Sequence, residues 1–141
     1  MKDVRLTAST EWDNRYKVEN IRKPNTKPWH GRGKGKNQWI AFNFRTVVKL
    51  SGFRYKAHTG WDGSSFNNFK FEYWSNNGTG WNIFHEGQGP NLDCCEWRVI
   101  DFHTSPSAKS FRLFMIDDWG YKWLSIEQLQ LKTINNCNSN K

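Results

Sequence analysis

Apolar and polar residues alternate with a period of two through most of this chain, a pattern that favours strands over helices. In QWIAFNF, residues 38–44, three apolar side chains share one side. In FKFEYWS, residues 69–75, the three aromatic side chains are expected to point inward and Lys70 and Glu72 outward. The same pattern predicts further strands at residues 4–8, 50–57, 81–86, 97–102, 110–116 and 126–132.

Polar turns separate these short strands. SNNGTGW, residues 75–81, is a hairpin signal because Asn-Gly favours positive φ. Eight short strands joined in this way predict an all-β fold, an eight-stranded antiparallel sandwich or jelly roll, with one short helical turn near residues 14–21. The 141 residues fit a single domain, 1–141, with a core from about 4 to 132 and a short polar tail at 133–141.

The predicted core is aromatic, because the chain holds twenty-three Phe, Trp and Tyr residues against nineteen Ile, Leu and Val. The alternation selects the core residues Phe42, Phe44, Phe69, Phe71, Leu113, Met115, Leu129 and Leu131. Trp29, Trp39 and Trp123 are also interpreted as core residues.

The positive charge is concentrated in one window. The chain carries a net charge of +8, and residues 15–36 hold eight basic residues and one acid, so this window alone contributes +7. Both interpretations stay open, an anion-binding patch or a solvated loop. The basic residues selected for an anion site are Arg22, Lys27, Arg32, Lys34 and Lys36.

Three long segments between strands have an unusual composition. Residues 23–37 read KPNTKPWHGRGKGKN, residues 58–68 read HTGWDGSSFNN, and residues 117–123 read DDWGYKW. Long loops on a rigid sandwich commonly bind ligands. Adjacent carboxylates at Asp117 and Asp118 make a poor acid–base pair, so we expect them to end a strand or to bond loop amides.

The cysteines, Cys94, Cys95 and Cys137, are odd in number and lack C-x-x-C spacing, which argues against a zinc site. Either of the first two could pair with Cys137, so the disulfide state stays open.

The ordered set TASTEWDN, PWH, NQWIAFNF, GFRYKAHTGWDGSSFNNFKFEYWSNNGTGW, FRLFMI and WLSIEQLQL resembles the discoidin domain, also called the coagulation factor 5/8 type C domain. That family includes many galactose-binding-like carbohydrate-binding modules. The resemblance runs from about Leu6 to Leu131 and implies an eight-stranded jelly-roll sandwich. It also implies a binding function, for galactose-type sugars, anionic phospholipid or proteins.

In the sugar-binding members, the ligand lies among the loops at one end of the sandwich. The resemblance implies that His30 matches the family His, that His58 replaces an Arg, and that an Asn position falls near Asp62 or Gly63. It implies an aromatic contact from Trp119 or Tyr121 and an acid from Asp13 or Glu11. A pyranose needs aromatic rings for its apolar face and polar groups for its hydroxyls, which adds Trp61 to the candidates.

The resemblance also implies a calcium site in many members, but here we expect none. Arg22 and Lys23 replace an Asp-Gly pair, and Gln128 stands where a Glu ligand would. Glu127 is one residue off, on the opposite face of a strand. Calcium prefers several carboxylate and carbonyl oxygens. We therefore hypothesise that the Arg22 guanidinium bonds the carbonyls that calcium would have gathered.

No nucleophile elbow, zinc-protease motif or P-loop is present, so we expect no enzyme and no catalytic residue. The predicted function is lectin-like carbohydrate binding, with acidic or sulfated glycans included. The alternative is binding of an anionic phospholipid or another polyanion, such as a sulfated polysaccharide, through residues 22–36. Nucleic acid is disfavoured, and oligomerisation stays open.

The expected location is extracellular or at the cell surface, although MKDVRLTAST shows no signal peptide. A cytoplasmic location stays open as the alternative.

Overall fold

The computed structural model describes residues 1, 3–24, 27–32, 35–57, 66–75, 80–89, 96–104, 106–120 and 123–134. Within these ranges the chain forms antiparallel strands and one short 3-10 helix, so the predicted all-β class is confirmed. None of the described residues forms a helix with the length and hydrophobicity that a membrane crossing requires. The elements are β1 (Val4–Ala8), η1 (Val18–Arg22), β2 (Trp29–His30), β3 (Lys36–Lys56), β4 (Asn68–Ser75), β5 (Gly80–Gln88), β6 (Trp97–Asp101), β7 (Ser107–Asp117), β8 (Ser125–Ile126) and β9 (Gln128–Ile134).

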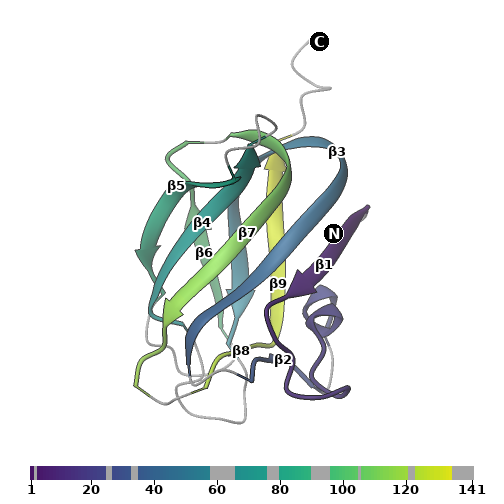
Figure 1. The fold of residues 1–141 in the computed structure, drawn as a ribbon, viewed down its shortest axis with the longest axis vertical. Helices are drawn as coiled ribbons and strands as arrows, with labels where there is room; N and C mark the ends of the chain where they lie inside the picture. Colours follow the sequence, from purple (N-terminus) through teal and green to yellow (C-terminus); the bar gives the residue numbers. More distant parts are fainter. Residues whose placement is uncertain are drawn as a thin grey trace.

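The strands form two layers of a jelly-roll sandwich, and β3 belongs to both of them (Figure 1). The front layer has the order β1-β3-β7-β4-β5, while β6 and β9 flank the second half of β3 at the back. The prediction of separate strands at 38–44 and 50–57 is therefore wrong, because one strand spans both. A register shift between Asn43 and Val48 lets β3 bend from layer to layer without ending.

Other predicted boundaries shift by a few residues. The helical turn expected at 14–21 is the helix η1 at Val18–Arg22. The last strand continues to Ile134, beyond the predicted end of the core at 132. The hairpin turn at 76–79, the three cysteines and the tail from 135 onward lie outside the described residues.

Gly52 is required where β3 packs against β6 in the back layer. A Cβ atom at this position would lie 2.3 Å from the carbonyl oxygen of Ile100, on the partner strand. That separation is impossible for a side chain, and a backbone atom cannot move aside cheaply. The close approach of the two strands therefore depends on glycine.

Phenyl rings fill the space between the layers, as the composition predicts. The ring of Phe53 lies 5.3 Å from that of Phe71, 5.8 Å from Phe69 and 5.9 Å from Phe102, measured between centroids. Such tilted and edge-to-face contacts add stability beyond the buried area. Six of the eight predicted core residues are fully buried, and Phe44 and Leu131 are partly buried at its margin. Trp29 is also in the core.

The outer face of the front layer carries a covered ion pair. Glu72 points outward as predicted, yet it is only 3% exposed because neighbouring side chains lie over it. Its Oε1 accepts bonds from Arg112 Nε at 2.9 Å and Nη2 at 2.8 Å. The Arg112 guanidinium carbon lies 4.5 Å from the ring centroid of Trp81 and 5.8 Å from that of Trp39. Trp39 thus lies on the outer face, and its interpretation as a core residue is wrong.

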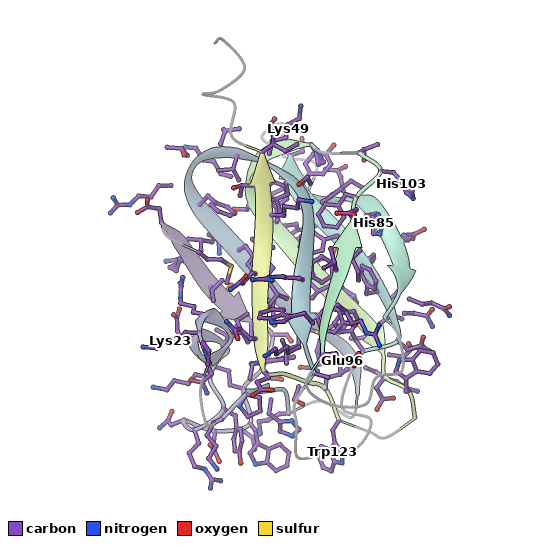
Figure 2. The ribbon with its side chains drawn as sticks, turned by 180° about the vertical axis from the view of Figure 1, so that it is seen from behind. Lys23, Lys49, His85, Glu96, His103 and Trp123 are labelled. Carbon is purple, nitrogen blue, oxygen red and sulfur yellow. The ribbon has the colours of Figure 1, made fainter. Side chains whose placement is uncertain are left out.

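We expect stability to fall in mild acid because of His85 in β5. Its imidazole packs 5.1 Å from the ring of Phe102 and 5.8 Å from that of His103 (Figure 2). Burial, and then the charge of His103, lower the pKa of His85 below its usual 6.5. The unfolded chain therefore binds the proton more readily, so this stability is present above pH 6.5 and is lost as pH falls through the lowered pKa.

Thermal unfolding at pH 7.5, 6.5 and 5.5 measures this effect. His85→Gln should unfold at a melting temperature that declines less between pH 7.5 and 5.5 than that of the unsubstituted chain. Equal declines in the two proteins would contradict the assignment to His85.

Candidate ligand-binding site

Four aromatic side chains meet at the end of the sandwich where β2 pairs with β8. The His30 ring lies 5.3 Å from Trp12, 5.6 Å from Trp123 and 5.8 Å from Tyr16, and the two tryptophans lie 5.6 Å apart, all between centroids. We call these four residues the aromatic cluster. Figure 2 shows Trp123 at the end of the molecule opposite Lys49.

Exposure differs sharply within the aromatic cluster. His30 is 5% exposed, whereas Trp12 and Trp123 are 41% and 43% exposed. The imidazole therefore forms the floor of the cluster, and two indole rings stand beside it in solvent. Large exposed aromatic surface next to a buried polar ring is typical of a binding site rather than of a core.

Backbone hydrogen bonds fasten the three segments that carry the aromatic cluster. The Trp12 amide donates to the His30 carbonyl at 2.7 Å, the His30 amide donates to the Tyr16 carbonyl at 3.3 Å, and the Gly31 amide donates to the Leu124 carbonyl at 3.0 Å. The β2–β8 pairing adds the register His30 to Ser125. The rings are held in place before any ligand arrives, which reduces the entropic cost of binding.

Side chains hold the same loops from behind. The buried Gln38 accepts hydrogen bonds at its Oε1 from the hydroxyls of Ser9 and Thr10. The Thr10 hydroxyl also accepts a bond from the Arg32 amide at 2.8 Å. These bonds join the loop before Trp12 to the segment after His30.

Asp117 ends β7 and Asp118 bonds loop amides, the two roles expected from the sequence for this carboxylate pair. Asp117 accepts bonds from the backbone and side-chain amides of Asn68, at 2.8 and 3.0 Å. Asp118 accepts bonds from the backbone amides of Gly120 at 2.9 Å and Trp123 at 3.1 Å. The second carboxylate therefore shapes the turn that presents Trp123.

Charged groups surround the aromatic cluster. Arg15 donates to Asp13 through its backbone amide at 2.8 Å and through Nη2 at 2.7 Å, and these bonds hold the pKa of Asp13 below its usual value. Lys27 Nζ lies 5.8 Å from the centroid of the Tyr16 ring. Arg32 and Lys36 are exposed.

Only part of the sequence-predicted site is brought together here. His30 belongs to the aromatic cluster and Asp13 lies beside it, but Trp119 is partly buried and makes no ring contact with it among the described residues. His58, Trp61, Asp62, Tyr121 and Lys34 lie outside the described residues. The interpretation of Trp123 as core is wrong, because 43% of it is exposed.

Sequence reasoning missed Trp12 and Tyr16 as well as the role of Trp123. Trp12 stands in the TEWDN segment directly before the candidate Asp13, and Trp123 ends the third unusual loop. Their aromatic character in loop sequence was the available signal. Only the folded chain shows that these two loops meet over His30.

Arg22 differs from the other predicted anion-binding residues that the structure describes, because its guanidinium bonds to groups of the chain itself. Its Nη1 donates to the Met1 carbonyl at 2.9 Å, its Nη2 to the Val4 carbonyl at 2.5 Å, and its Nε to Glu19. The guanidinium thus ties η1 to the start of β1. The carbonyls of Met1 and Val4 and the Glu19 carboxylate thus face a fixed positive charge. Among the described residues, no group of three or more His, Cys, Asp and Glu could hold a metal.

The sequence matches the F5/8 type C domain over residues 5–129. The chain therefore belongs to the F5/8 type C, or discoidin, domain family. No curated protein gave a significant match.

Solved structures share the fold at low identity. The F5/8 type C domain of a Bacteroides fragilis protein aligns with a TM-score of 0.78 at 13% identity, covering 94% of this chain and 93% of that one. The family 32 carbohydrate-binding module of NanJ from Clostridium perfringens, in complex with galactose, aligns with a TM-score of 0.75 at 16% identity, covering 92% and 93%. The family 32 module of AlyQ, in complex with 4,5-unsaturated mannuronic acid, aligns with a TM-score of 0.70 at 18% identity, covering 90% and 92%.

Proposed function

We propose that this domain is a non-catalytic carbohydrate-binding domain whose ligand binds at the aromatic cluster. The observation that carries the proposal is the pair of exposed tryptophans, Trp12 and Trp123, which contact each other and the buried His30. Indole rings cover the apolar C–H face of a pyranose, and polar groups at the rim bond its hydroxyls. Structural neighbours bound to galactose and to a mannuronic acid derivative support the same ligand class.

Binding on a glycan array, followed by calorimetry on each positive glycan, tests the proposal. We expect at least one saccharide to bind with one-to-one stoichiometry, at a single site on the domain. An array without positive glycans, together with unchanged Trp fluorescence in concentrated mono- and disaccharides, would overturn it. The proposed ligand class places the domain outside the cell or at its surface, with a cytoplasmic location as the alternative.

A second candidate, adhesion to anionic phospholipid, is favoured by the exposed basic residues Lys27, Arg32 and Lys36. Each basic residue near an anionic membrane contributes about 1 kcal/mol. Sedimentation with phosphatidylserine vesicles, compared with phosphatidylcholine vesicles, separates this function from saccharide binding. Self-association, which would raise avidity in either case, stays a prediction.

We also propose that the fold needs no calcium, because the Arg22 guanidinium bonds the carbonyls of Met1 and Val4. The melting temperature should be the same in excess chelator as in calcium at about 2 mM, a concentration that would occupy a typical extracellular calcium module. Arg22→Ala should destabilise the domain by about 1–3 kcal/mol, since it leaves two carbonyls and Glu19 without their partner.

A matched control is Arg5→Ala, which removes an exposed arginine from the neighbouring strand β1. Its expected cost is within about 0.5 kcal/mol. A rise of several degrees on adding calcium to the unsubstituted chain, or an ion bound through Glu127, would contradict the calcium proposal.

A further inference from the structure

Three carboxylates in the loops that carry Trp12 and Trp123 are engaged by donors of the chain itself. Glu11 accepts a bond from the Val18 amide at 2.7 Å, and Asp118 holds the Gly120 and Trp123 amides. Asp13 receives three N–H groups of Arg15, with Nη2 at 2.7 Å from Oδ2. The acids at this end therefore shape the loops, and Asp13 with Arg15 forms a neutral pair.

Three basic residues at the same end, in contrast to these carboxylates, form no ion pairs in the part of the chain that the structure describes. Lys27, Arg32 and Lys36 are exposed, and none of them forms an ion pair within the described part of the chain. Long charged side chains without partners remain available to a ligand. The exposed charge that these three residues leave unpaired is thus positive.

Two of these basic residues are connected to the aromatic cluster itself. Lys27 Nζ lies 5.8 Å from the Tyr16 ring centroid, and that ring lies 5.8 Å from His30. Arg32 follows His30 by two residues, and its amide is fixed by the hydroxyl of Thr10, two residues before Trp12. A saccharide held by Trp12 and Trp123 would therefore lie against loops that are joined to the segments carrying these cations.

We propose that the aromatic cluster selects a saccharide that carries an anionic group, a carboxylate or a sulfate, and that Lys27 and Arg32 bind that group. This inference rests on the proposed carbohydrate-binding function and narrows it to acidic sugars. Charge-assisted hydrogen bonds to a carboxylate or sulfate are stronger than neutral ones. A neutral sugar would leave the basic residues without a counterion and would gain nothing from them.

Probe pairs that differ only in charge test the proposal. Oligosaccharides of galacturonate, mannuronate and glucuronate are compared with their methyl esters, and sulfated galactan oligosaccharides with their desulfated forms. Titration calorimetry at 50 mM and 500 mM sodium chloride, chosen as about a tenfold span of ionic strength, gives each affinity. We expect at least one acidic probe to bind about tenfold or more tightly than its neutral form, with a smaller ratio at high salt.

The variant Lys27→Gln/Arg32→Gln should lose that preference, with about a tenfold or greater drop for the acidic probe. Affinity for the neutral form should stay the same. The control is Lys49→Gln, which removes a positive charge at the opposite end of the molecule (Figure 2). It should leave both affinities unchanged at 500 mM salt, where the field of so distant a charge is screened.

The outcomes separate this inference from the proposed function. Equal affinities for the charged and neutral probes, lost together in Trp123→Ala, would overturn the inference and leave carbohydrate binding intact. An equal loss in Lys27→Gln/Arg32→Gln and Lys49→Gln would also overturn it, because net charge would then be the cause. Binding to phosphatidylserine vesicles with no response to any saccharide would overturn both.

Discussion

Trp123→Ala is expected to weaken saccharide binding by about 30-fold or more, with little change in the melting temperature. The indole is 43% exposed, so its removal costs the core little, while the ligand loses a main contact surface. Single central aromatic contacts commonly contribute about 2–4 kcal/mol to binding. Trp12→Ala should act in the same direction, because its ring lies 5.6 Å from Trp123.

Trp74→Ala is the matched control for these substitutions. Trp74 is also 43% exposed, but it lies on β4, where it pairs with Trp81 of β5 and is remote in sequence from the aromatic cluster. Its substitution should leave saccharide affinity unchanged in calorimetry. A loss of affinity in Trp74→Ala equal to that in Trp123→Ala would place the ligand elsewhere.

Arg112→Ala is expected to destabilise the domain by about 3–5 kcal/mol, because it leaves the Glu72 carboxylate buried without its partner. The Glu72 side chain is only 4% exposed, Arg112 bonds it at 2.8 Å, and the one other cation in its described ion pairs, Lys70 Nζ, lies 3.9 Å away. Three rings around the guanidinium, those of Trp39, Trp81 and Phe114, would lose their cation at the same time. The melting temperature should fall by about 10 °C or more.

The pair Lys132 and Asp101 provides a surface comparison. Both side chains are well exposed and their charged atoms lie 3.4 Å apart, so Lys132→Ala should cost less than about 1 kcal/mol. The double variant Arg112→Met/Glu72→Gln should recover part of the loss, since no buried carboxylate is then left without Arg112 and the remaining Lys70 is partly exposed. Comparable losses in Arg112→Ala and Lys132→Ala would show that burial of Glu72 is not the cause.

Period-two alternation is sufficient to predict most strands and most of the core, because side-chain direction in a strand depends on the position in sequence alone. It identifies Phe42, Phe71 and Leu113 as buried, and all three are. It cannot show that a strand continues through a bend. The alternation is interrupted between residues 44 and 50, whereas the register shift between Asn43 and Val48 only redirects β3.

Period-two alternation also fails to predict which residues are buried on the outer face of a sheet. Glu72 points away from the core, as its position predicts, yet Trp81 of the next strand and Arg112 of the other neighbour close over it. Cross-strand partners decide such burial, and these partners are 9 and 40 residues away in sequence. The same limit explains why Trp123, rather than Trp119, meets His30.

The bend of β3 through both layers bears on how the domain folds. Neither layer has a complete set of strands without this one segment, since β1 and β7 bond its first half while β6 and β9 bond its second. Most of these pairings join residues far apart in sequence, so large loops must close before any of them contributes. Both layers therefore depend on the placement of the same strand. Assembly of the domain is expected to be slow, and the nascent chain can complete the front layer only after β7 has been made and the back layer only after β9, its last described strand, has been made.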